Sequence, residues 1–299
     1  MLSPFDLDLR QAQDVVRRAL EEDVGSGDVT TEALVPADAK ASGAFVAREA
    51  GVLAGMGVAS LAFWEIDKGV QIEPLVQDGQ RFAAGATLAR LRGSARALLI
   101  AERVALNLLQ RLSGVATMSR RFVEAVEGTG AQVYDTRKTT PGLRLLEKYA
   151  VRAGGAKNHR MGLYHEGLVK DNHLAVLAKR AGSAVAAIDL KGPVAAIRGR
   201  RPGIFVEVEV ALEAALGRAL DAEPDAILLD NMTPDGLRRC VAIVRERTAP
   251  GARRPVLEAS GGVRLETVRA VAESGVDRVS VGALTHSARA LDISLELEF

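Results

Sequence analysis

The sequence predicts an α/β protein whose C-terminal half forms a parallel β/α barrel with fewer than eight strands. After Gly130, short apolar runs alternate with helical segments, and this order is typical of parallel βαβ units. The runs are continuous rather than alternating, as expected of parallel strands that are buried on both faces. An open doubly wound sheet is the alternative.

The segment before Gly130 predicts helices mixed with a second, smaller sheet. Apolar residues at helical spacing predict a first helix over 9–22, which ends in a glycine-containing loop. Turn-bounded apolar runs then predict three strands, over 43–48, 70–76 and 86–91. A helix is predicted between the first two, over 57–67. The loop 78–85 is typical of tight turns in small sandwich domains. It carries no lysine at its tip, so it is interpreted as structural and not as a biotinyl or lipoyl carrier.

Two helices complete this part, an amphipathic one over 94–112 and a shorter one over 115–126. The glycine in Ser113-Gly114 is predicted to separate them. Arg103, Asn107 and Arg111 are spaced four residues apart and form one polar stripe, which is most simply a face exposed to solvent.

The C-terminal half contains six predicted strands that alternate with helices. The strands cover 131–134, 167–169, 204–210, 226–229, 255–257 and 278–281. The helices cover 142–153, 174–181, 211–220, 234–246 and 265–273. The last residues, 289–299, are predicted to pack back on the N-terminal domain.

Each predicted strand ends in a polar or glycine-containing cluster. In chain order the clusters are Asp135-Thr136-Arg137-Lys138, Lys170-Asp171-Asn172, Glu207 with Glu209, Asp230-Asn231, Glu258-Ala259-Ser260-Gly261-Gly262 and Gly282-Ala283. In barrels and open sheets alike, the carboxyl edge of parallel strands carries the active site. We therefore expect the clusters to meet at one edge. The cations Arg137, Lys138, Arg160 and Lys170 would form a pocket there for a small, highly charged anion.

Carboxylates and glycines supply the rest of this edge. Glu207, Glu209, Asp230 and Glu258 could ligate a hard cation such as Mg²⁺, bind sugar hydroxyls or pair with the arginines, and the sequence leaves these roles open. The segments 260–262 and 281–283 follow the last two strands. Many barrels bind phosphate in those loops, at helix N-termini.

Several classes of function are excluded by what the sequence lacks. There is no GxxxxGK[ST] loop and no GxGxxG fingerprint, so neither nucleoside-triphosphate hydrolysis nor a Rossmann dinucleotide site is indicated. The four histidines lack the spacing of a metal site, and His159, beside Arg160, is expected to donate to substrate. Lys plus Arg (39) nearly equals Asp plus Glu (38), so no global field favours nucleic acid or a membrane surface.

A cytoplasmic location is expected from three further features. The single cysteine, Cys240, fits a reducing compartment. The N-terminal segment has no apolar core of the kind found in signal peptides. No apolar run approaches the ~20 residues that a membrane-spanning helix needs.

The motifs, taken together and in order, resemble the quinolinate phosphoribosyltransferase family over nearly the whole chain. The resemblance rests on Asp135–Gly142, Gly154-Gly155, Asn158-His159-Arg160, Lys170–His173, Glu207–Glu209, Leu229–Asn231 and Glu258–Gly262, with further likeness at Glu22-Asp23, Gly27–Thr31 and Ala101–Asn107. Tyr164-His165-Glu166-Gly167 departs from the family pattern, in which an aspartate and small apolar residues are expected. The molybdenum-associated relatives lack the Lys170–His173 run.

This resemblance implies an N-terminal α/β sandwich domain over 1–114, to which residues 287–299 return, and an incomplete parallel β/α barrel over 115–286. It implies a homodimer with a shared active site and leaves open whether dimers assemble further. It also implies a reaction of NAD biosynthesis with Mg²⁺, in which quinolinate and 5-phosphoribosyl 1-diphosphate give nicotinate mononucleotide, diphosphate and CO₂.

Transferred residue by residue, the resemblance also implies a site. The two substrates would be bound by Thr136, Arg137, Lys138, His159, Arg160 and Lys170, with Arg103 supplied by the partner subunit. Glu209 and Asp230 would hold ribose hydroxyls and Mg²⁺. The phosphate would lie on Ser260, Gly261, Gly262, Val281, Gly282 and Ala283. The catalytic residues would be Lys138, Lys170, Glu209 and Asp230.

The charges agree with this chemistry. A dicarboxylate and a phosphorylated sugar diphosphate require several guanidinium and ammonium groups. Carboxylates can stabilise an oxocarbenium-like transition state. We hypothesise that Lys138 or Lys170 stabilises the carbanion left by CO₂. A nicotinate or nicotinamide phosphoribosyltransferase would need fewer cations, and a sensor or carrier for an anion would not explain Glu209 and Asp230.

Overall fold

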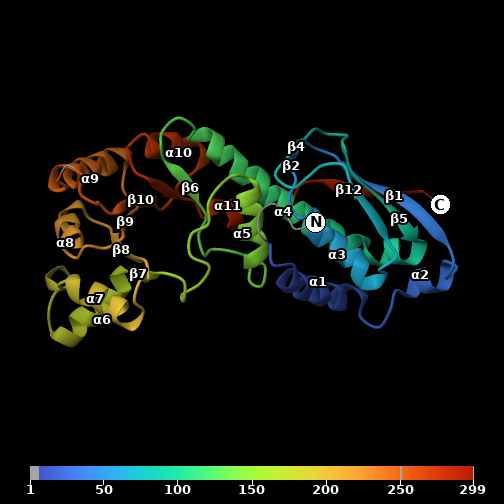
Figure 1. The fold of residues 1–299 in the computed structure, drawn as a ribbon, viewed down its shortest axis with the longest axis horizontal. Coiled ribbons are helices and arrows are strands. Elements are labelled where there is room, and N and C mark those ends of the chain that lie inside the picture. The colour runs from blue at the N-terminus through green and yellow to red at the C-terminus, as the bar shows by residue number, and fades with distance from the viewer. Residues whose placement is uncertain (1–6, 250, 299) are drawn as a thin grey trace. The chain divides into compact units, whose positions relative to one another are not determined.

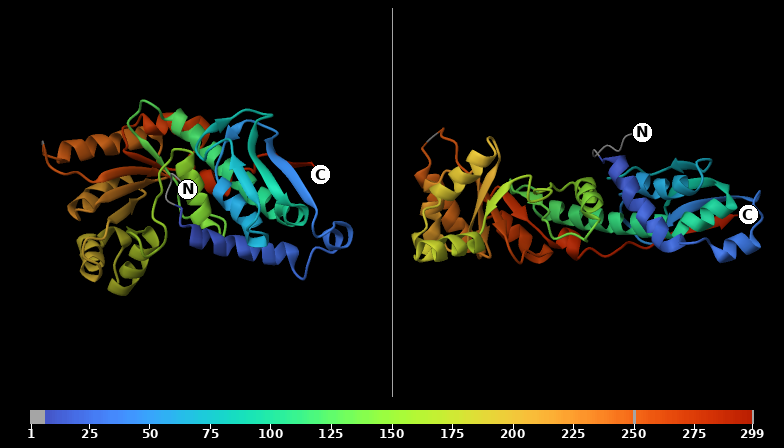
Figure 2. Two further views of the ribbon diagram at one scale, coloured as in Figure 1. Left: turned by 45° about the vertical axis from the view of Figure 1, so that its right-hand side comes forward. Right: turned by 90° about the horizontal axis from the view of Figure 1, so that it is seen from below.

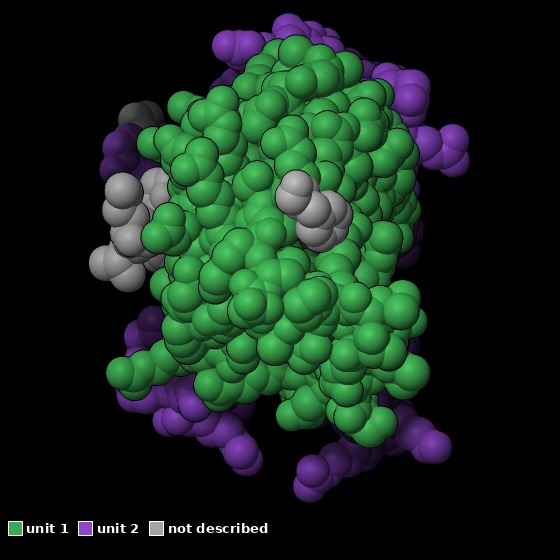
Figure 3. Space-filling view, turned by 90° about the vertical axis from the view of Figure 1, so that its right-hand side faces the viewer, with its two compact units in different colours: residues 1–121, 138–156, 284–299 green, residues 122–137, 157–283 purple. Residues whose placement is uncertain are grey.

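The structure, a computed structural model, describes residues 7–249 and 251–298, and it divides into two compact units (Figures 1 and 2). The first unit comprises residues 1–121, 138–156 and 284–299, and the second comprises 122–137 and 157–283. Figure 3 colours the two units separately. Each unit is therefore assembled from more than one stretch of the sequence, and the first unit includes both early and late residues. No described helix has both the length and the apolar character needed to span a membrane.

The first unit is built on a four-stranded antiparallel sheet in the order β12-β1-β5-β3. Its strands are β1 (Lys40–Ala47), β3 (Gln71–Pro74), β5 (Thr87–Ser94) and β12 (Ile293–Glu298). A separate pair joins β2 (Gly51–Val52) to β4 (Arg81–Phe82). Ser42 to Ala47 pair with Glu298 to Ile293, so the last strand lies beside the first.

The helices of this unit are α1 (Leu9–Val24), α2 (Val29–Leu34), α3 (Met56–Ile66), α5 (Arg144–Ala153) and part of α4 (Ala95–Ala125), followed late in the chain by α11 (Ala283–His286). Asp8 and Asp28 cap α1 and α2, since each carboxylate accepts backbone N–H groups of the first turn. The core includes Phe45 and Phe63, whose ring centroids lie 6.0 Å apart.

The predicted break at Ser113-Gly114 is wrong, because α4 runs without interruption from Ala95 to Ala125. Gly114 serves packing instead. A Cβ atom at this position would lie 1.9 Å from the carbonyl oxygen of Arg289, so only glycine lets that backbone approach the helix. Ser113 is also buried, and its hydroxyl hydrogen-bonds to the backbone of Ala54.

The second unit contains a six-stranded sheet in the order β6-β11-β10-β9-β8-β7. The strands are β6 (Gln132–Tyr134), β7 (Gly167–Val169), β8 (Val206–Val210), β9 (Ala226–Asp230), β10 (Val256–Ser260) and β11 (Arg278–Ser280), and all neighbours are parallel. Among the described residues β6 and β7 pair with no further strand of this sheet, so the barrel does not close. This confirms the predicted fold class, which combines an incomplete parallel β/α barrel with an N-terminal α/β domain.

The helices of the second unit are α6 (Asp171–Ala181), α7 (Lys191–Arg200), α8 (Leu216–Asp221), α9 (Pro234–Arg247) and α10 (Leu265–Ala272), with short 3₁₀ turns η1 (Val185–Ala187) and η2 (Glu213–Ala215). The sequence did not predict α7. Gly192, Pro193 and Gly199 give this segment a low intrinsic helix propensity, and its packing on β7 and β8 stabilises it.

Candidate active site

The register of the parallel strands brings the polar clusters to one edge. Val169 of β7 pairs with Val208 of β8, which sets Lys170 level with Glu209. Ser260 of β10 pairs with Asp230 of β9, and Ser280 of β11 pairs with Tyr134 of β6. The predicted site residues of the second unit that lie within the last two residues of these strands or shortly after them are Thr136, Arg137, Lys170, Glu209, Asp230, Ser260, Gly261, Gly262, Val281, Gly282 and Ala283.

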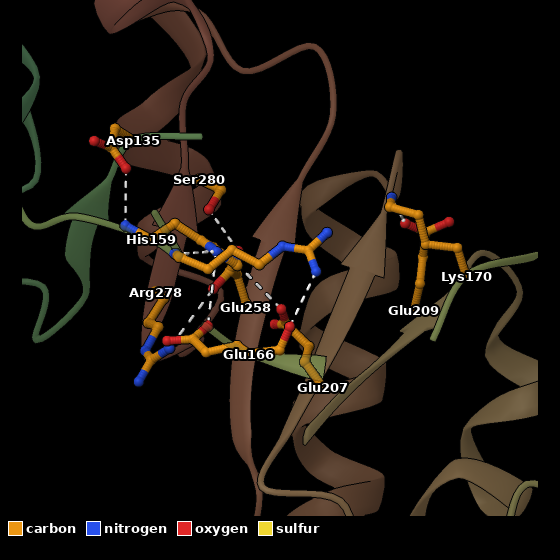
Figure 4. A network of polar contacts seen from close by, with 10 residues as sticks. Asp135, His159, Glu166, Lys170, Glu207, Glu209, Glu258, Arg278 and Ser280 are labelled. Carbon is orange, nitrogen blue, oxygen red and sulfur yellow. Dashed lines mark hydrogen bonds and ion pairs between the residues drawn. The ribbon is translucent and has the colours of Figure 1, made fainter. Parts of the chain in front are cut away.

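Lys170 and Glu209 form an ion pair at this edge. The Nζ atom of Lys170 contacts Oε2 of Glu209, and Figure 4 shows the two side chains directed at each other. The Lys170 side chain is 41% exposed and that of Glu209 is 10% exposed. His173 orders the same segment, because its Nδ1 accepts the backbone N–H of Lys170 at 2.9 Å. An accessible ammonium group therefore stands beside a mostly buried carboxylate.

The loops after β9 and β10 pack tightly against each other. Asn231, in the left-handed conformation (φ 54°), donates its backbone N–H to Ser260 O at 2.8 Å and its side-chain amide to Asp230 at 2.6 Å. A Cβ atom on Gly261 would lie 2.1 Å from Asn231 Oδ1. Gly261 therefore has to be glycine for Ser260 and Asp230 to share this edge. Val281 extends the edge by donating its N–H to Tyr134 O at 2.8 Å.

Arg160 is a buried cation. It is 6% exposed, and its Nη1 donates to the carbonyl oxygen of Glu166 at 3.1 Å. Burial and the neighbouring charge of Arg137 lower the pKa of Arg160. Two guanidinium groups held near each other in a desolvated place are favoured when an anion lies between them.

The unusual segment Tyr164-His165-Glu166-Gly167 belongs to this environment. The Glu166 carbonyl accepts from Arg160, and the Tyr164 carbonyl accepts from Arg201 at 2.5 Å. His165 Nδ1 accepts the backbone N–H of Met161 at 3.3 Å. Hydrogen bonds to two backbone carbonyls of the segment and to the His165 ring therefore hold it in place. The side chain of Tyr164 is 67% exposed.

His159 lies inside a buried cluster with Glu207 and Glu258 (Figure 4). Its Nε2 atom is 3.2 Å from Glu207 and 3.4 Å from Glu258. Its backbone N–H donates to Asp135 at 2.8 Å, and Asn158 donates to the other oxygen of that carboxylate. The cluster ties the end of β6 to β8 and β10.

Glu258 connects this cluster to β11. It accepts a hydrogen bond from the Ser280 hydroxyl, and Arg278 Nη1 lies 3.9 Å from its second oxygen. The Arg278 guanidinium in turn lies over the rings of Tyr134 and Phe205, at 4.7 and 5.4 Å from their centroids. Glu207 and Glu258 are 1% and 0% exposed, so both lie within the sheet and not at its edge, where the sequence placed them.

The charge state of His159 follows from its neighbours. Burial opposes protonation, but the hydrogen bonds and charges of Glu207 and Glu258 outweigh it and raise the pKa of His159 to about 10. The Arg160 N–H lies 2.8 Å from Nδ1, a contact that suits the neutral imidazole. Two buried carboxylates outweigh one amide donor, so His159 is an imidazolium at neutral pH. Burial and Glu258 raise the pKa of Glu207.

The remaining sequence-predicted cations belong to the first unit. Lys138 has an exposed side chain and begins the loop that leads to α5. Arg103 and Asn107 are exposed on α4, as the polar stripe predicted. Arg111 differs, because its guanidinium binds the buried carboxylate of Glu147 at 2.7 Å. The stripe is therefore not wholly a solvated face.

A cavity of about 850 Å³ lies elsewhere, at the amino ends of β8, β9 and β10. Its arginines are paired with carboxylates: Arg198 and Arg253 with Asp225, Arg247 with Asp221, and Arg254 with Asp277. Each of the four arginines thus has a carboxylate partner, with Asp225 shared by two of them, and the cavity is at the edge opposite to the clusters above. It does not form part of the candidate site.

Comparisons with known families match almost the whole chain. The family described as quinolinate phosphoribosyl transferase, N-terminal domain, matches residues 28–113, and its C-terminal domain matches residues 115–296. The chain is 45% identical to the nicotinate-nucleotide pyrophosphorylase [carboxylating] of Mycobacterium leprae, over 99% of this chain and 100% of that one. It is 38% identical to a mitochondrial quinolinate phosphoribosyltransferase [decarboxylating] of Nicotiana tabacum, over 96% of this chain and 82% of that one.

A solved structure agrees with these sequence matches. The crystal structure of NadC from Streptococcus pyogenes superposes with a TM-score of 0.88 at 39% identity, and it covers 98% of both chains. At this coverage the similarity extends over both compact units.

Proposed function

Because this chain belongs to the quinolinate phosphoribosyltransferase family, we propose how its residues carry out that family's reaction. The enzyme converts quinolinate and 5-phosphoribosyl 1-diphosphate into nicotinate mononucleotide, diphosphate and CO₂, a reaction of NAD biosynthesis. It is a transferase of the pentosyl class.

One observation carries the residue assignments: cations and carboxylates lie along a single edge, where Lys170 and Glu209 are in contact. Arg137, Arg160 and Lys170 supply positive charge, while Glu209 and Asp230 on adjacent strands supply negative charge. A planar dicarboxylate suits guanidinium groups, which bind carboxylates bidentately. The carboxylates suit the hydroxyls of a ribose, and the loops 260–262 and 281–283 suit its phosphate.

The transfer step needs no covalent nucleophile from the protein. The ring nitrogen of quinolinate attacks the anomeric carbon, and the bond from that carbon to diphosphate breaks with its electron pair leaving on diphosphate. Positive charge develops on the ribose during this exchange, so the carboxylates of Glu209 and Asp230 stabilise the transition state electrostatically. The cations stabilise the departing diphosphate and hold quinolinate in position for the attack.

Glu209 and Asp230 would also hold Mg²⁺. Their oxygen ligands fit a hard cation, and both residues lie on the edge that carries the cationic groups. Bound there, Mg²⁺ would neutralise diphosphate oxygens. The His159 cluster is less suited to Mg²⁺, because its imidazolium and Arg278 already compensate the carboxylates.

Loss of CO₂ follows the transfer. The bond between the ring and the carboxylate beside the nitrogen breaks, its electron pair stays on the ring carbon, and that carbon then takes a proton. The quaternised nitrogen stabilises the pair, and an ammonium group from Lys138 or Lys170 adds a second positive charge. His159 is 9% exposed on its side chain and faces Glu207 and Glu258, so its contribution to substrate binding would pass through Arg160.

A homodimer with a shared site is part of this proposal. Arg103 is exposed on α4, where a neighbouring chain can meet it. Exposed apolar side chains supply surface for such a contact, in the first unit at Val29 and Leu34 and in the second at Leu163, Tyr164 and Val176.

Parallel assays test the reaction. Purified protein with Mg²⁺ and the phosphoribosyl donor would be offered quinolinate, nicotinate and nicotinamide, and nucleotide and CO₂ would be measured. We expect nucleotide and CO₂ in equal amounts from quinolinate alone. Product from nicotinate without product from quinolinate would reject the proposed substrate. Undiminished product from quinolinate after Mg²⁺ is removed with EDTA would reject the role of Mg²⁺.

Mixed variants test the shared site. Arg103→Ala and Lys138→Ala proteins would each be inactive, and mixed dimers should regain part of the activity because one of the two sites then has both residues. A lack of recovery in dimers shown by mass spectrometry to be mixed would reject a contribution of Arg103 across the interface.

A further inference from the structure

The segment from Lys138 to Leu143 joins β6 to α5 without helix or strand hydrogen bonds of its own. It carries the exposed side chain of Lys138, and Gly142 within it has a φ of +80°. Such a segment is free to move unless side chains from elsewhere hold its backbone. We call residues 138–143 the lysine loop.

Two buried side chains hold this loop, one at Lys138 and the other at Thr140. The hydroxyl of Thr285 donates to the carbonyl oxygen of Lys138 at 2.8 Å, although the two residues are 147 positions apart. The carboxylate of Glu147 accepts the backbone N–H of Thr140 at 3.0 Å and its hydroxyl at 2.7 Å. Thr285 and Glu147 are both 0% exposed.

Arg111 connects the two anchors. Its Nε and Nη2 atoms lie 3.1 and 2.7 Å from the same oxygen of Glu147. The same guanidinium donates to the backbone carbonyls of Thr285 and Ala288. The contacts therefore close a hydrogen-bonded ring that passes from Lys138 through Thr285, Arg111 and Glu147 to Thr140, all within the first compact unit.

We propose that Arg111, Glu147 and Thr285 are positioning residues that fix the lysine loop and so aim Lys138 at the substrates. The inference rests on the proposed role of Lys138 in the reaction. None of the three needs to touch a substrate. They act on the backbone that carries the lysine.

The physical reason is preorganisation. A loop that is ordered before the substrates bind does not lose conformational entropy when they do, and a charged group displaced by about 1 Å can lower the rate by 10²-fold. The ion pair of Arg111 and Glu147 suits this role because its members are also fully hydrogen-bonded. A buried carboxylate with fewer partners would cost more than it contributes.

Thr285 offers a matched pair of variants. Thr285→Val keeps the shape and removes the hydroxyl, whereas Thr285→Ser keeps the hydroxyl. Both would be assayed with quinolinate beside wild type, and backbone amide exchange of residues 138–143 would be followed by mass spectrometry. We expect Thr285→Val to lose about 10- to 100-fold in kcat/KM and to exchange faster in the lysine loop. Thr285→Ser should remain within about threefold of wild type.

Glu147→Gln gives a second test in case the first variant folds poorly. It keeps an acceptor for Thr140 but weakens the bond to Arg111, so we expect faster exchange in residues 138–143 with α4 still protected.

The exchange measurement does not depend on which substrate the enzyme takes. An inactive wild type would therefore reject the proposed function, while wild-type exchange and wild-type kcat/KM in Thr285→Val and Glu147→Gln would reject the positioning role. The positioning role would also be rejected if the activity lost by each variant equalled the fraction of that variant that is unfolded.

Discussion

The ammonium group of Lys170 is bound to the carboxylate of Glu209, across the neighbouring strands β7 and β8. Each residue neutralises the charge of the other. In the proposed mechanism, the substrates and Mg²⁺ would compete for these two groups and separate them. The pair thus links the cationic and the anionic parts of the site.

Lys170→Met should abolish most of the activity with little effect on stability. The Lys170 side chain is 41% exposed, so solvent screens the ion pair, and we expect the unfolding free energy to change by less than about 1 kcal/mol. The loss of an electrostatic contact to substrate should lower kcat/KM by at least about 100-fold. Lys179→Met, an exposed lysine on the same helix, is the control and should keep its activity. Steady-state kinetics and urea unfolding measure the two effects, and equal activity in both variants would contradict the assignment.

The stability should fall at alkaline pH because of His159. Its pKa is about 10 in the folded protein and 6.5 ordinarily, so the folded state binds the proton more tightly. This contribution to stability is fully present below pH 6.5 and is lost as the pH rises through about 10. Urea unfolding at a series of pH values should show the decline in wild type and a flatter profile in His159→Gln. An imidazole resonance of His159 that titrates near pH 6.5 would contradict the prediction.

The two buried glutamates should differ in what they contribute. Burial and the charge of Glu258 raise the pKa of Glu207, so the negative charge of Glu207 is the less favourable of the two. Glu207→Gln removes this charge and should therefore cost little stability. Glu258→Gln removes the charge that faces His159, Ser280 and Arg278, and breaking a buried pair typically costs about 3–5 kcal/mol. We expect the larger loss of unfolding free energy in Glu258→Gln. The reverse order would show that Glu207 carries the negative charge of the cluster.

Gly114→Ala should destabilise the first unit. The added Cβ would lie 1.9 Å from the Arg289 carbonyl oxygen, and strain of this kind costs about 1–3 kcal/mol. Gly57→Ala on α3 is the control, since no atom lies within 4 Å of the added carbon and the helix gains up to about 1 kcal/mol from alanine. Thermal unfolding of both variants measures the difference. A Gly114→Ala protein as stable as wild type would show that the chain near Arg289 can move aside.

Much of the fold could be predicted because its local signals agree with one another. The strands β7 and β9 and the helices α1 and α9 lie within about two residues of the predicted ranges, since period and turn residues coincide there. The unbroken α4 and the helix α7 were not predicted. In both helices, tertiary packing overrides a local sequence signal. The glycine at 114 does not end α4 but lets a distant backbone segment approach it, and α7 forms despite its low helix propensity because it packs on β7 and β8.

The sequence by itself determined which charges the site contains. Residue types at the ends of parallel strands place Arg137, Lys170, Glu209 and Asp230 on one edge, because parallel strands share a direction. The tertiary structure alone decided which buried charges meet: His159 with Glu207 and Glu258, and Arg111 with Glu147. The physical reason is that a buried charge must find a partner in space. That partner comes from segments whose distance in sequence no local pattern encodes.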